Sequence, residues 1–164
     1  MEISIDKLRD FPVFGGLTDE ILKFIIQEAA YISAATGDYY FRENDPASAM
    51  YVLLSGEVGA FKTWQQHEYL VRKLGTGDCF GEMALIDLRP RSASIKALTP
   101  CETLELTSAT FYEIYRQDLE QFTLMYMNLG RELSRRLRRS DELAFSALIH
   151  AREFEGKLPG QCTG

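Results

Sequence analysis

The sequence has few of the residues that build metal centres and disulfide frameworks. Its three cysteines, Cys79, Cys101 and Cys162, are odd in number and widely spaced, and none of them forms a Cys-x-x-Cys pair. This pattern argues against a disulfide framework and against a zinc site. The two histidines, His67 and His150, stand alone, whereas a cupin-type metalloenzyme needs clustered histidines with a carboxylate. We therefore expect incidental or buried thiols and no metal cofactor.

Long apolar runs and an excess of positive charge are also missing. No apolar run approaches the length of a membrane span, and the N-terminus alternates charges without a basic region before an apolar stretch. We expect a soluble, cytoplasmic protein with no secretory signal. The formal net charge of -6 disfavours non-specific attraction to nucleic acid, although it does not by itself exclude DNA binding. No Ser-His-Asp or Cys-His arrangement is evident, so we expect no enzyme activity.

What the sequence does contain is enough apolar material for one folded domain. Its 164 residues, of which 46% are hydrophobic and 12% aromatic, suit a core that needs neither metal nor disulfide support. We expect a single domain over residues 1–155. The last residues, 156–164, contain glycine, proline and glutamine, and we expect them to form a disordered tail.

The periodicity of the chain changes twice. Thr18 supplies a candidate N-cap, and apolar residues at helical spacing behind it predict a helix near residues 18–28. Residues 30–106 consist of short β-branched and aromatic runs with turn signals about every 8 to 12 residues, which predicts an antiparallel barrel or sandwich. In one strand Ala93, Ile95 and Ala97 alternate with polar residues, so one face of that strand is expected to lie against a core.

The last part of the chain is helical by pattern. A helix capped by Thr107 or Ser108 is followed by a long run, from about residue 119 to 153, that no proline interrupts. Small and apolar residues recur in that run at alternating spacings of four and three: Tyr126, Gly130, Leu133, Leu137, Ser140, Ala144 and Ala147. Such a seam is expected where two helices pack together, either between two chains or on the protein's own barrel.

The most informative segment runs from Phe80 to Ala97, with the sequence FGEMALIDLRPRSASIKA. It holds a Gly-Glu pair and a Pro-Arg-Ser run within one short stretch between strands. The guanidinium of Arg91 offers a planar donor fork that matches two phosphate oxygens, and the carboxylate of Glu82 accepts hydrogen bonds from sugar hydroxyls. The segment can therefore hold a cyclic phosphate and a ribose at once.

This segment resembles the phosphate-binding cassette of the cyclic nucleotide-binding domain family, the family of catabolite activator protein and protein kinase A regulatory subunits. The spacing matches without insertion or deletion, and the likeness extends upstream through residues 37–46, 50–58 and 74–78, so that it covers roughly residues 11–150. The resemblance implies a mainly β fold with flanking helices: an antiparallel jelly-roll barrel, N-terminal helices and a long C-terminal helix. We refer to residues 80–97 as the cassette.

The resemblance also implies roles for cassette residues. Arg91 would grip the cyclic phosphate with help from Ser92, Glu82 would bind the ribose 2′-hydroxyl, and Gly81 would let the ligand approach its backbone. From the residues alone, Gly81 could equally be a turn glycine, Glu82 a helix cap and Ser92 a polar loop residue. Members of the family that prefer cyclic GMP often carry threonine at the position of Ser92, so serine favours cyclic AMP, with cyclic GMP as the other candidate ligand.

The base of the nucleotide needs an apolar wall and a lid. The resemblance places several further residues near the ligand, although each could also be ordinary core: Met83, Ala84, Ala93, Val71 and Leu74. For the lid, the long helix resembles that of catabolite activator protein through residues 135–137. This brings Ser140 and Asp141 to the positions that contact adenine. Asp141 departs from the hydroxyl residue usual there, and a solvated helix face is the alternative for it.

The sequence therefore predicts a cyclic nucleotide-sensing regulatory module whose helices after Thr107 close as a lid. The seam of the long helix predicts a homodimer, and the effector protein that the module informs is not indicated. The alternative is the effector-binding part of a Crp-like transcription regulator. Residues 152–164 are too few for a helix-turn-helix, so we expect no direct DNA binding by this chain.

Overall fold

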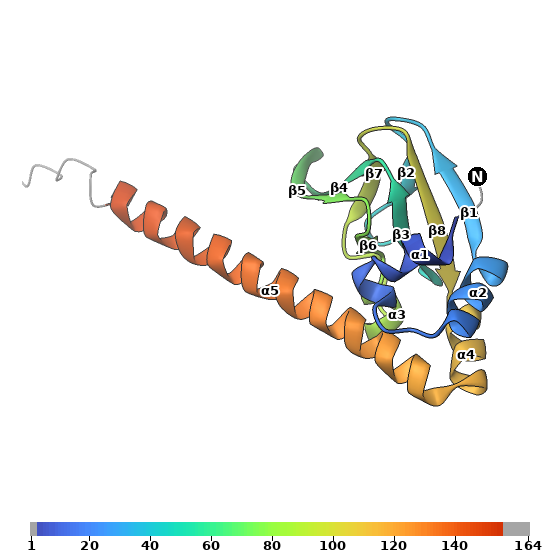
Figure 1. Cartoon of the computed structure of the whole chain (residues 1–164). Coiled ribbons are helices and arrows are strands. Elements are labelled where there is room, and N and C mark those ends of the chain that lie inside the picture. Colours follow the sequence, from blue (N-terminus) through green and yellow to red (C-terminus); the bar gives the residue numbers. More distant parts are fainter. Residues whose placement is uncertain (1–2, 156–164) are drawn as a thin grey trace, which may run out of the picture. The chain divides into compact units, whose positions relative to one another are not determined.

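The computed structural model describes residues 3–155 of the chain (Figure 1). These residues form parts of two compact units, which divide between Leu129 and Gly130. The first unit contains both sheets and most of the helices, and the second contains the remainder of the last helix. The predicted tail, 156–164, lies outside the described residues, and the single-domain assignment of residues 1–155 stays a prediction.

Two α-helices and a short 3-10 helix precede the first strand. They are α1 (Ile5–Arg9), η1 (Pro12–Phe14) and α2 (Asp19–Glu28). The predicted helix near residues 18–28 is thus confirmed, with Thr18 at its N-cap and two acidic residues in its first turn, where they suit the helix dipole. Its apolar face buries Ile21, Leu22 and Ile25 in the core.

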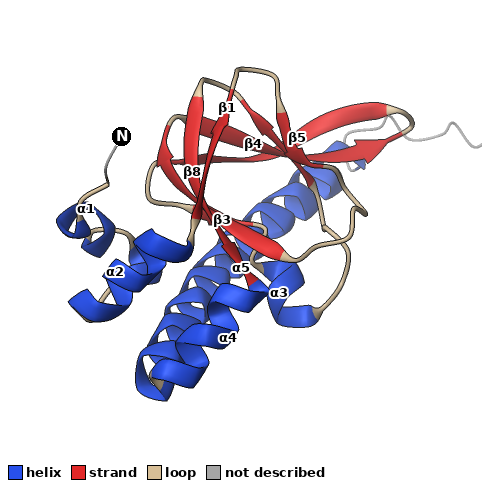
Figure 2. Cartoon of the chain, turned by 90° about the vertical axis from the view of Figure 1, so that its right-hand side faces the viewer, coloured by secondary structure: helices blue, strands red, loops and turns tan. Residues whose placement is uncertain are grey.

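The strands form two four-stranded antiparallel sheets, shown in red in Figure 2. In spatial order the first sheet consists of β1 (Ala30–Ala34), β8 (Cys101–Thr107), β3 (Ala49–Ser55) and β6 (Cys79–Phe80). The second sheet consists of β2 (Tyr39–Phe41), β7 (Ser94–Ala97), β4 (Glu57–Trp64) and β5 (His67–Gly75). The mainly β fold with flanking helices is confirmed, but the strands form two separate sheets and not one closed barrel.

The first sheet separates two hydrophobic cores, because successive side chains of a strand point to opposite faces. On β3, Met50, Val52 and Leu54 belong to the core that the sheet shares with the helices. Tyr51 and Leu53 belong to the core shared with β4, β6 and β7. The site described below lies at the edge of this second core.

Strand β7 follows the predicted alternation only in part. Ile95 and Ala97 are buried as expected, and Ala93 just before the strand is half-buried. Ser94, expected on the polar face, is also buried; its hydroxyl accepts a hydrogen bond from the Glu43 backbone N–H at 2.9 Å. This bond satisfies the polar group and ties the start of β7 to the segment after β2.

Three helices follow or interrupt the sheets: α3 (Met83–Asp87), α4 (Ser108–Gln117) and α5 (Leu119–Glu155). The hydroxyl of Thr107 accepts from the Thr110 backbone N–H at 3.2 Å and so caps α4, as the sequence indicated. In the first unit, α5 buries Met125 and Leu129, and the Asn128 amide donates to the Gly15 carbonyl at 2.8 Å. No helix in the described range is long and apolar enough to cross a membrane.

Candidate functional site

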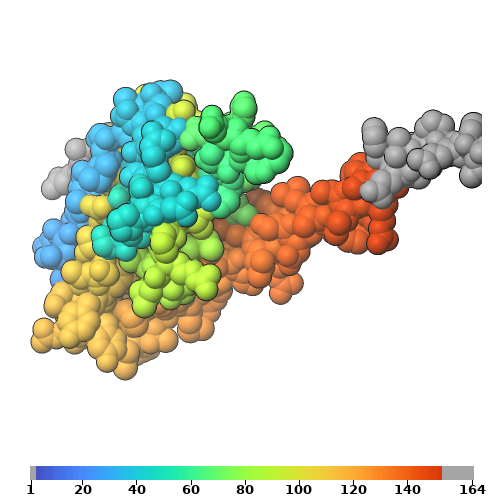
Figure 3. All heavy atoms as spheres, turned by 180° about the vertical axis from the view of Figure 1, so that it is seen from behind, coloured from blue at the N-terminus to red at the C-terminus, as the bar shows by residue number. Residues whose placement is uncertain are grey.

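The cassette begins where the short strand β6 ends. Gly81 follows with φ = 78°, a left-handed conformation that glycine adopts without a steric penalty, and Glu82 starts α3. At the other end of α3, Leu88 takes φ = 57° and turns the chain into the loop that carries Arg91. Two backbone reversals therefore fold the cassette so that Arg91 returns to Gly81. In Figure 3 the yellow-green surface of this region lies beside the cyan segment that includes β2.

Arg91 is held on both its backbone and its side chain. Its backbone N–H donates to the Asp45 carbonyl at 2.9 Å, and its carbonyl accepts from the Asn44 N–H at 2.9 Å. Its Nη1 donates to the Gly81 carbonyl at 2.9 Å, and the guanidinium lies 3.9 Å from the centroid of the Phe41 ring. Arg91 is therefore fixed between the start of the cassette at Gly81 and the segment of residues 41–45, which is distant in sequence.

The glycine at position 81 is needed by the arginine itself. A Cβ atom built on Gly81 would lie 2.5 Å from Arg91 Nη1 and 3.2 Å from Cε1 of Phe41, in addition to the strain that a side chain meets at this φ. The sequence suggested that Gly81 makes room for a ligand. The structure shows that the space at its Cα is already filled by the guanidinium.

The guanidinium is buried without full compensation. Arg91 is only 5% exposed, and its Nε is a buried polar atom that has no hydrogen-bond partner. Burial lowers the pKa of Arg91 from its usual value, while Tyr51, Asp45, Glu105 and Glu82 act in the opposite direction. A buried cation with an unused donor is a site at which an anion gains strong, charge-assisted hydrogen bonds.

Glu82 is also buried, at 4% exposed, and its charge favours the charged form of Arg91. Its backbone carbonyl accepts the first helical bonds of α3, from Leu85 and Ile86. Its side chain makes no capping hydrogen bond, so the carboxylate does not play the helix-cap role that the sequence left open. The structure thus brings together the carboxylate and the guanidinium that the sequence had singled out.

The other predicted ligand residues fall into three groups. Met83 and Ser92 lie at the cassette surface, with Ser92 Oγ 3.7 Å from the Met83 sulfur, and Ala93 is half-buried beside them. Ala84 and Leu74 are buried, Leu74 in the core that includes Tyr51 and Phe80. Val71 is exposed on β5, at the edge of the second sheet. None of these burial states tests a contact with a nucleotide, so their roles stay predictions.

Ser140 and Asp141 lie in the second unit, on exposed turns of α5. The Ser140 hydroxyl donates to the Arg136 carbonyl at 3.0 Å, one helical turn earlier. Their predicted contacts with adenine therefore stay predictions. On the same helix Glu132 bonds Arg135 Nη2 at 2.8 Å and Arg136 Nε at 2.9 Å, so part of the arginine-rich stretch forms intrahelical ion pairs.

An aromatic cluster that the sequence did not predict lies next to Arg91, whose guanidinium faces two of its rings, Phe41 and Tyr51. Tyr40, Phe41, Tyr51 and Phe80 have ring centroids between 5.0 and 6.2 Å apart in the contacting pairs. Tyr51 donates a hydrogen bond to Glu105 Oε1 at 2.8 Å. Burial, followed by this bond, raises the pKa of Tyr51 to about 12. These rings come from β2, β3 and β6, and the only sequence signal for them is that each lies in a strand.

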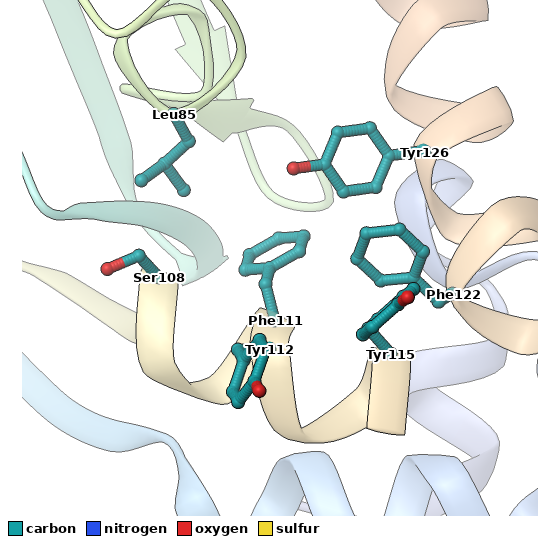
Figure 4. A pocket seen from close by; sticks show the side chains of 7 residues that line it. All are labelled: Leu85, Ser108, Phe111, Tyr112, Tyr115, Phe122 and Tyr126. Carbon is teal, nitrogen blue, oxygen red and sulfur yellow. The ribbon is translucent and has the colours of Figure 1, made fainter. Parts of the chain in front are cut away.

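A pocket of about 300 Å³ lies beside α3, α4 and the first turns of α5 (Figure 4). Leu85 of α3 lines it together with residues of the two other helices: Ser108, Phe111, Tyr112, Tyr115, Phe122 and Tyr126. Phe111 and Phe122 each contact the ring of Tyr126, at centroid distances of 5.8 and 4.6 Å. The cassette helix and the helices that follow the sheets therefore share one incompletely filled aromatic space.

Within residues 3–155, no group of three or more His, Cys, Asp or Glu side chains is placed so that it could hold a metal ion. Cys79 and Cys101 are both buried. The groups that the cassette offers to a ligand are the guanidinium of Arg91, the carboxylate of Glu82 and the hydroxyl of Ser92.

Comparisons with known proteins identify the family of the chain. The family model described as "Cyclic nucleotide-binding domain" matches residues 31–118. The cyclic AMP receptor protein of Thermus thermophilus is 33% identical over 135 residues, which are 82% of this chain and 61% of the receptor. A cAMP-dependent protein kinase regulatory subunit of Emericella nidulans is 35% identical over 60% of this chain and 24% of the subunit. The chain thus spans only part of either relative.

Solved structures of cyclic nucleotide-binding proteins are also similar to this chain. Catabolite activator protein from Thermus thermophilus superposes with a TM-score of 0.71 at 32% identity, over 84% of this chain and 63% of that one. The regulatory domain of Toxoplasma gondii protein kinase A, crystallised with cAMP, gives a TM-score of 0.62 at 30% identity over 67% of this chain and 42% of that one. The protein described here belongs to the cyclic nucleotide-binding domain family.

Proposed function

We propose that this chain binds cyclic AMP in the cassette and responds by closing the helices that follow β8. The observation that carries the proposal is the buried guanidinium of Arg91, which keeps an unpartnered Nε. A cyclic phosphate brings one negative charge and two exocyclic oxygens, which match a planar donor fork better than a single point charge would. In this proposal the ligand supplies the hydrogen-bond acceptor and the negative charge that compensate the buried guanidinium.

The residues next to Arg91 complete the proposed binding site. Ser92 follows Arg91 directly and is exposed, so its hydroxyl is available to the same phosphate. Glu82 accepts from the ribose 2′-hydroxyl, as the resemblance implies. Met83 is 45% exposed at the start of α3 and offers an apolar surface for the base, and the small side chain of Ala84 follows it. Val71, Leu74, Ala93, Ser140 and Asp141 remain the candidates for the rest of the base site.

Removing the guanidinium should abolish most of the affinity. Arg91→Ala deletes a buried bidentate phosphate contact, so we expect cyclic AMP to bind about 30-fold or more weakly. The measurement is isothermal titration calorimetry with the purified chain. Arg89→Ala is the matched control, because Arg89 is an exposed arginine of the same loop and should leave affinity unchanged. Equal affinities of wild-type protein and Arg91→Ala for cyclic AMP would falsify the assigned role.

Ligand preference should depend on Ser92. Relatives include proteins named for each nucleotide, among them a mouse cGMP-dependent protein kinase at 30% identity over 61% of this chain. With serine at position 92 we expect the wild-type chain to bind cyclic AMP more tightly than cyclic GMP. Ser92→Thr should shift the ratio of the two dissociation constants toward cyclic GMP, measured by parallel titrations. An unchanged ratio would remove Ser92 as a selectivity determinant.

The lid in this proposal consists of α4 and the first turns of α5. Support comes from the pocket of about 300 Å³ that these helices share with Leu85 of α3, because unfilled space allows helices to shift. Saturating cyclic AMP should therefore slow hydrogen exchange of the backbone amides of α4 (residues 108–117) relative to those of α1. If cyclic AMP binds and the exchange rates of the α4 amides do not change, α4 is not part of a lid.

The seam of α5 supports a homodimer. Leu137, a residue of the seam, is 63% exposed on the second unit, which leaves apolar surface for a partner helix to cover. Leu137→Glu should convert the dimer to a monomer in light scattering at micromolar concentration. Leu143→Glu is the matched control, since Leu143 is equally exposed but lies off the seam. A wild-type monomer would rule out the dimer.

A transcription regulator of the Crp type remains the second candidate. The observation that favours it is the match to 61% of the Thermus thermophilus receptor, which leaves more than a third of that protein without a counterpart in this chain. In that case residues 3–155 would be the effector-binding part, and the downstream partner would be DNA reached through another domain. The length of the native open reading frame decides between the two.

A further inference from the structure

The hydrogen bond between Tyr51 and Glu105 lies next to Arg91 but has no part in the proposed ligand contacts. We infer that Tyr51 and Glu105 act as a positioning pair, which holds the Arg91 guanidinium in the orientation that accepts a phosphate. This inference rests on the proposed function and adds to it two residues outside the cassette. Both come from the first sheet, where β3 and β8 pair Tyr51 directly with Glu105.

The Tyr51 ring has little freedom to move. It stacks on Phe80 at a centroid distance of 5.2 Å and an interplanar angle of 16°, and it lies 6.0 Å from the centroid of Phe41. Its hydroxyl is fixed by Glu105 Oε1 at 2.8 Å. The guanidinium carbon of Arg91 lies 6.0 Å from the ring centroid, so Tyr51 and Phe41 together form the aromatic surface that the cation faces.

Because Glu105 bonds the Tyr51 hydroxyl and not Arg91 itself, the donors of the guanidinium stay available to a ligand. A carboxylate in direct contact would occupy the donors that a phosphate needs, whereas Arg91 Nη1 bonds the Gly81 carbonyl and Arg91 Nε has no hydrogen-bond partner. Glu105 instead bonds the phenol, while its charge and that of Glu82 still favour the cationic state of Arg91. The pair therefore offsets part of the cost of burying the cation without competing with the phosphate.

A second tyrosine–glutamate bond in the chain provides a matched control. Tyr39 on β2 bonds Glu68 on β5 at 2.8 and 2.7 Å, but this pair is solvent-exposed. The cations that lie over the Tyr39 ring are those of Arg42 and Lys96. Its removal should not change ligand affinity, although it breaks the same type of bond.

The test is a double-mutant cycle on cyclic AMP affinity, measured by calorimetry with the full chain. Tyr51→Phe keeps the ring and removes the bond, so affinity should fall about three- to tenfold, the usual range for one hydrogen bond. In the Arg91→Lys background, which keeps the charge and lacks the fork, the same change should cost less than about twofold. Tyr39→Phe should match wild type in both backgrounds.

Glu105 is tested by rescue. Glu105→Gln keeps an acceptor for the Tyr51 hydroxyl and should stay within about twofold of wild-type affinity, whereas Glu105→Leu should lose as much as Tyr51→Phe. Thermal melting of every variant confirms that it is folded. The pair is refuted if wild type binds while Tyr51→Phe binds equally well, or if Tyr51→Phe costs the same in both arginine backgrounds. A wild-type chain that binds no cyclic nucleotide overturns the proposed function as well.

Discussion

The burial of one positive charge organises this site. Arg91 is nearly inaccessible, yet it bonds a backbone carbonyl and faces aromatic rings in place of a carboxylate. Keeping a cation in such surroundings requires a glycine at position 81, a phenylalanine at position 41 and a loop at residues 44–45 that clamps the arginine backbone. Arg91 thereby joins β2, the end of β6 and the loop of the cassette, and its contacts hold these segments in place relative to one another.

Local signals predicted much of the fold. Thr18 and Thr107 marked the starts of α2 and α4 because N-cap preference is a property of a few adjacent residues, although of the two only the Thr107 hydroxyl makes a capping hydrogen bond. The cassette was equally visible, since Glu82 and Arg91 lie in one continuous stretch. Turn spacing predicted the strands but left barrel and sandwich open, because the arrangement in two sheets depends on pairing between strands that are far apart in sequence.

The aromatic and carboxylate surroundings of Arg91 were not predictable in the same way. Strand β3 reads AMYVLLS, a run whose first six residues are all buried, so alternation gives no sign that Tyr51 faces the second sheet while Met50 faces the helices. Glu105 looks like an ordinary polar residue of an alternating strand until the register of β3 and β8 places it opposite Tyr51. The register between β3 and β8 depends on tertiary structure, and only this register shows that Tyr51 and Glu105 lie together beside Arg91.

The same arrangement explains how occupancy of the site can reach the helices. In the proposed mechanism, an anion at the unpartnered Nε compensates the charge of the buried guanidinium, so that the ligand-bound arrangement has contacts that the ligand-free one lacks. Glu82 is among the charges that act on Arg91 and is also the N-cap residue of α3. Leu85 of α3 lines the aromatic pocket together with Phe111 of α4. We therefore propose that a shift of α3 on ligand binding changes the packing available to α4.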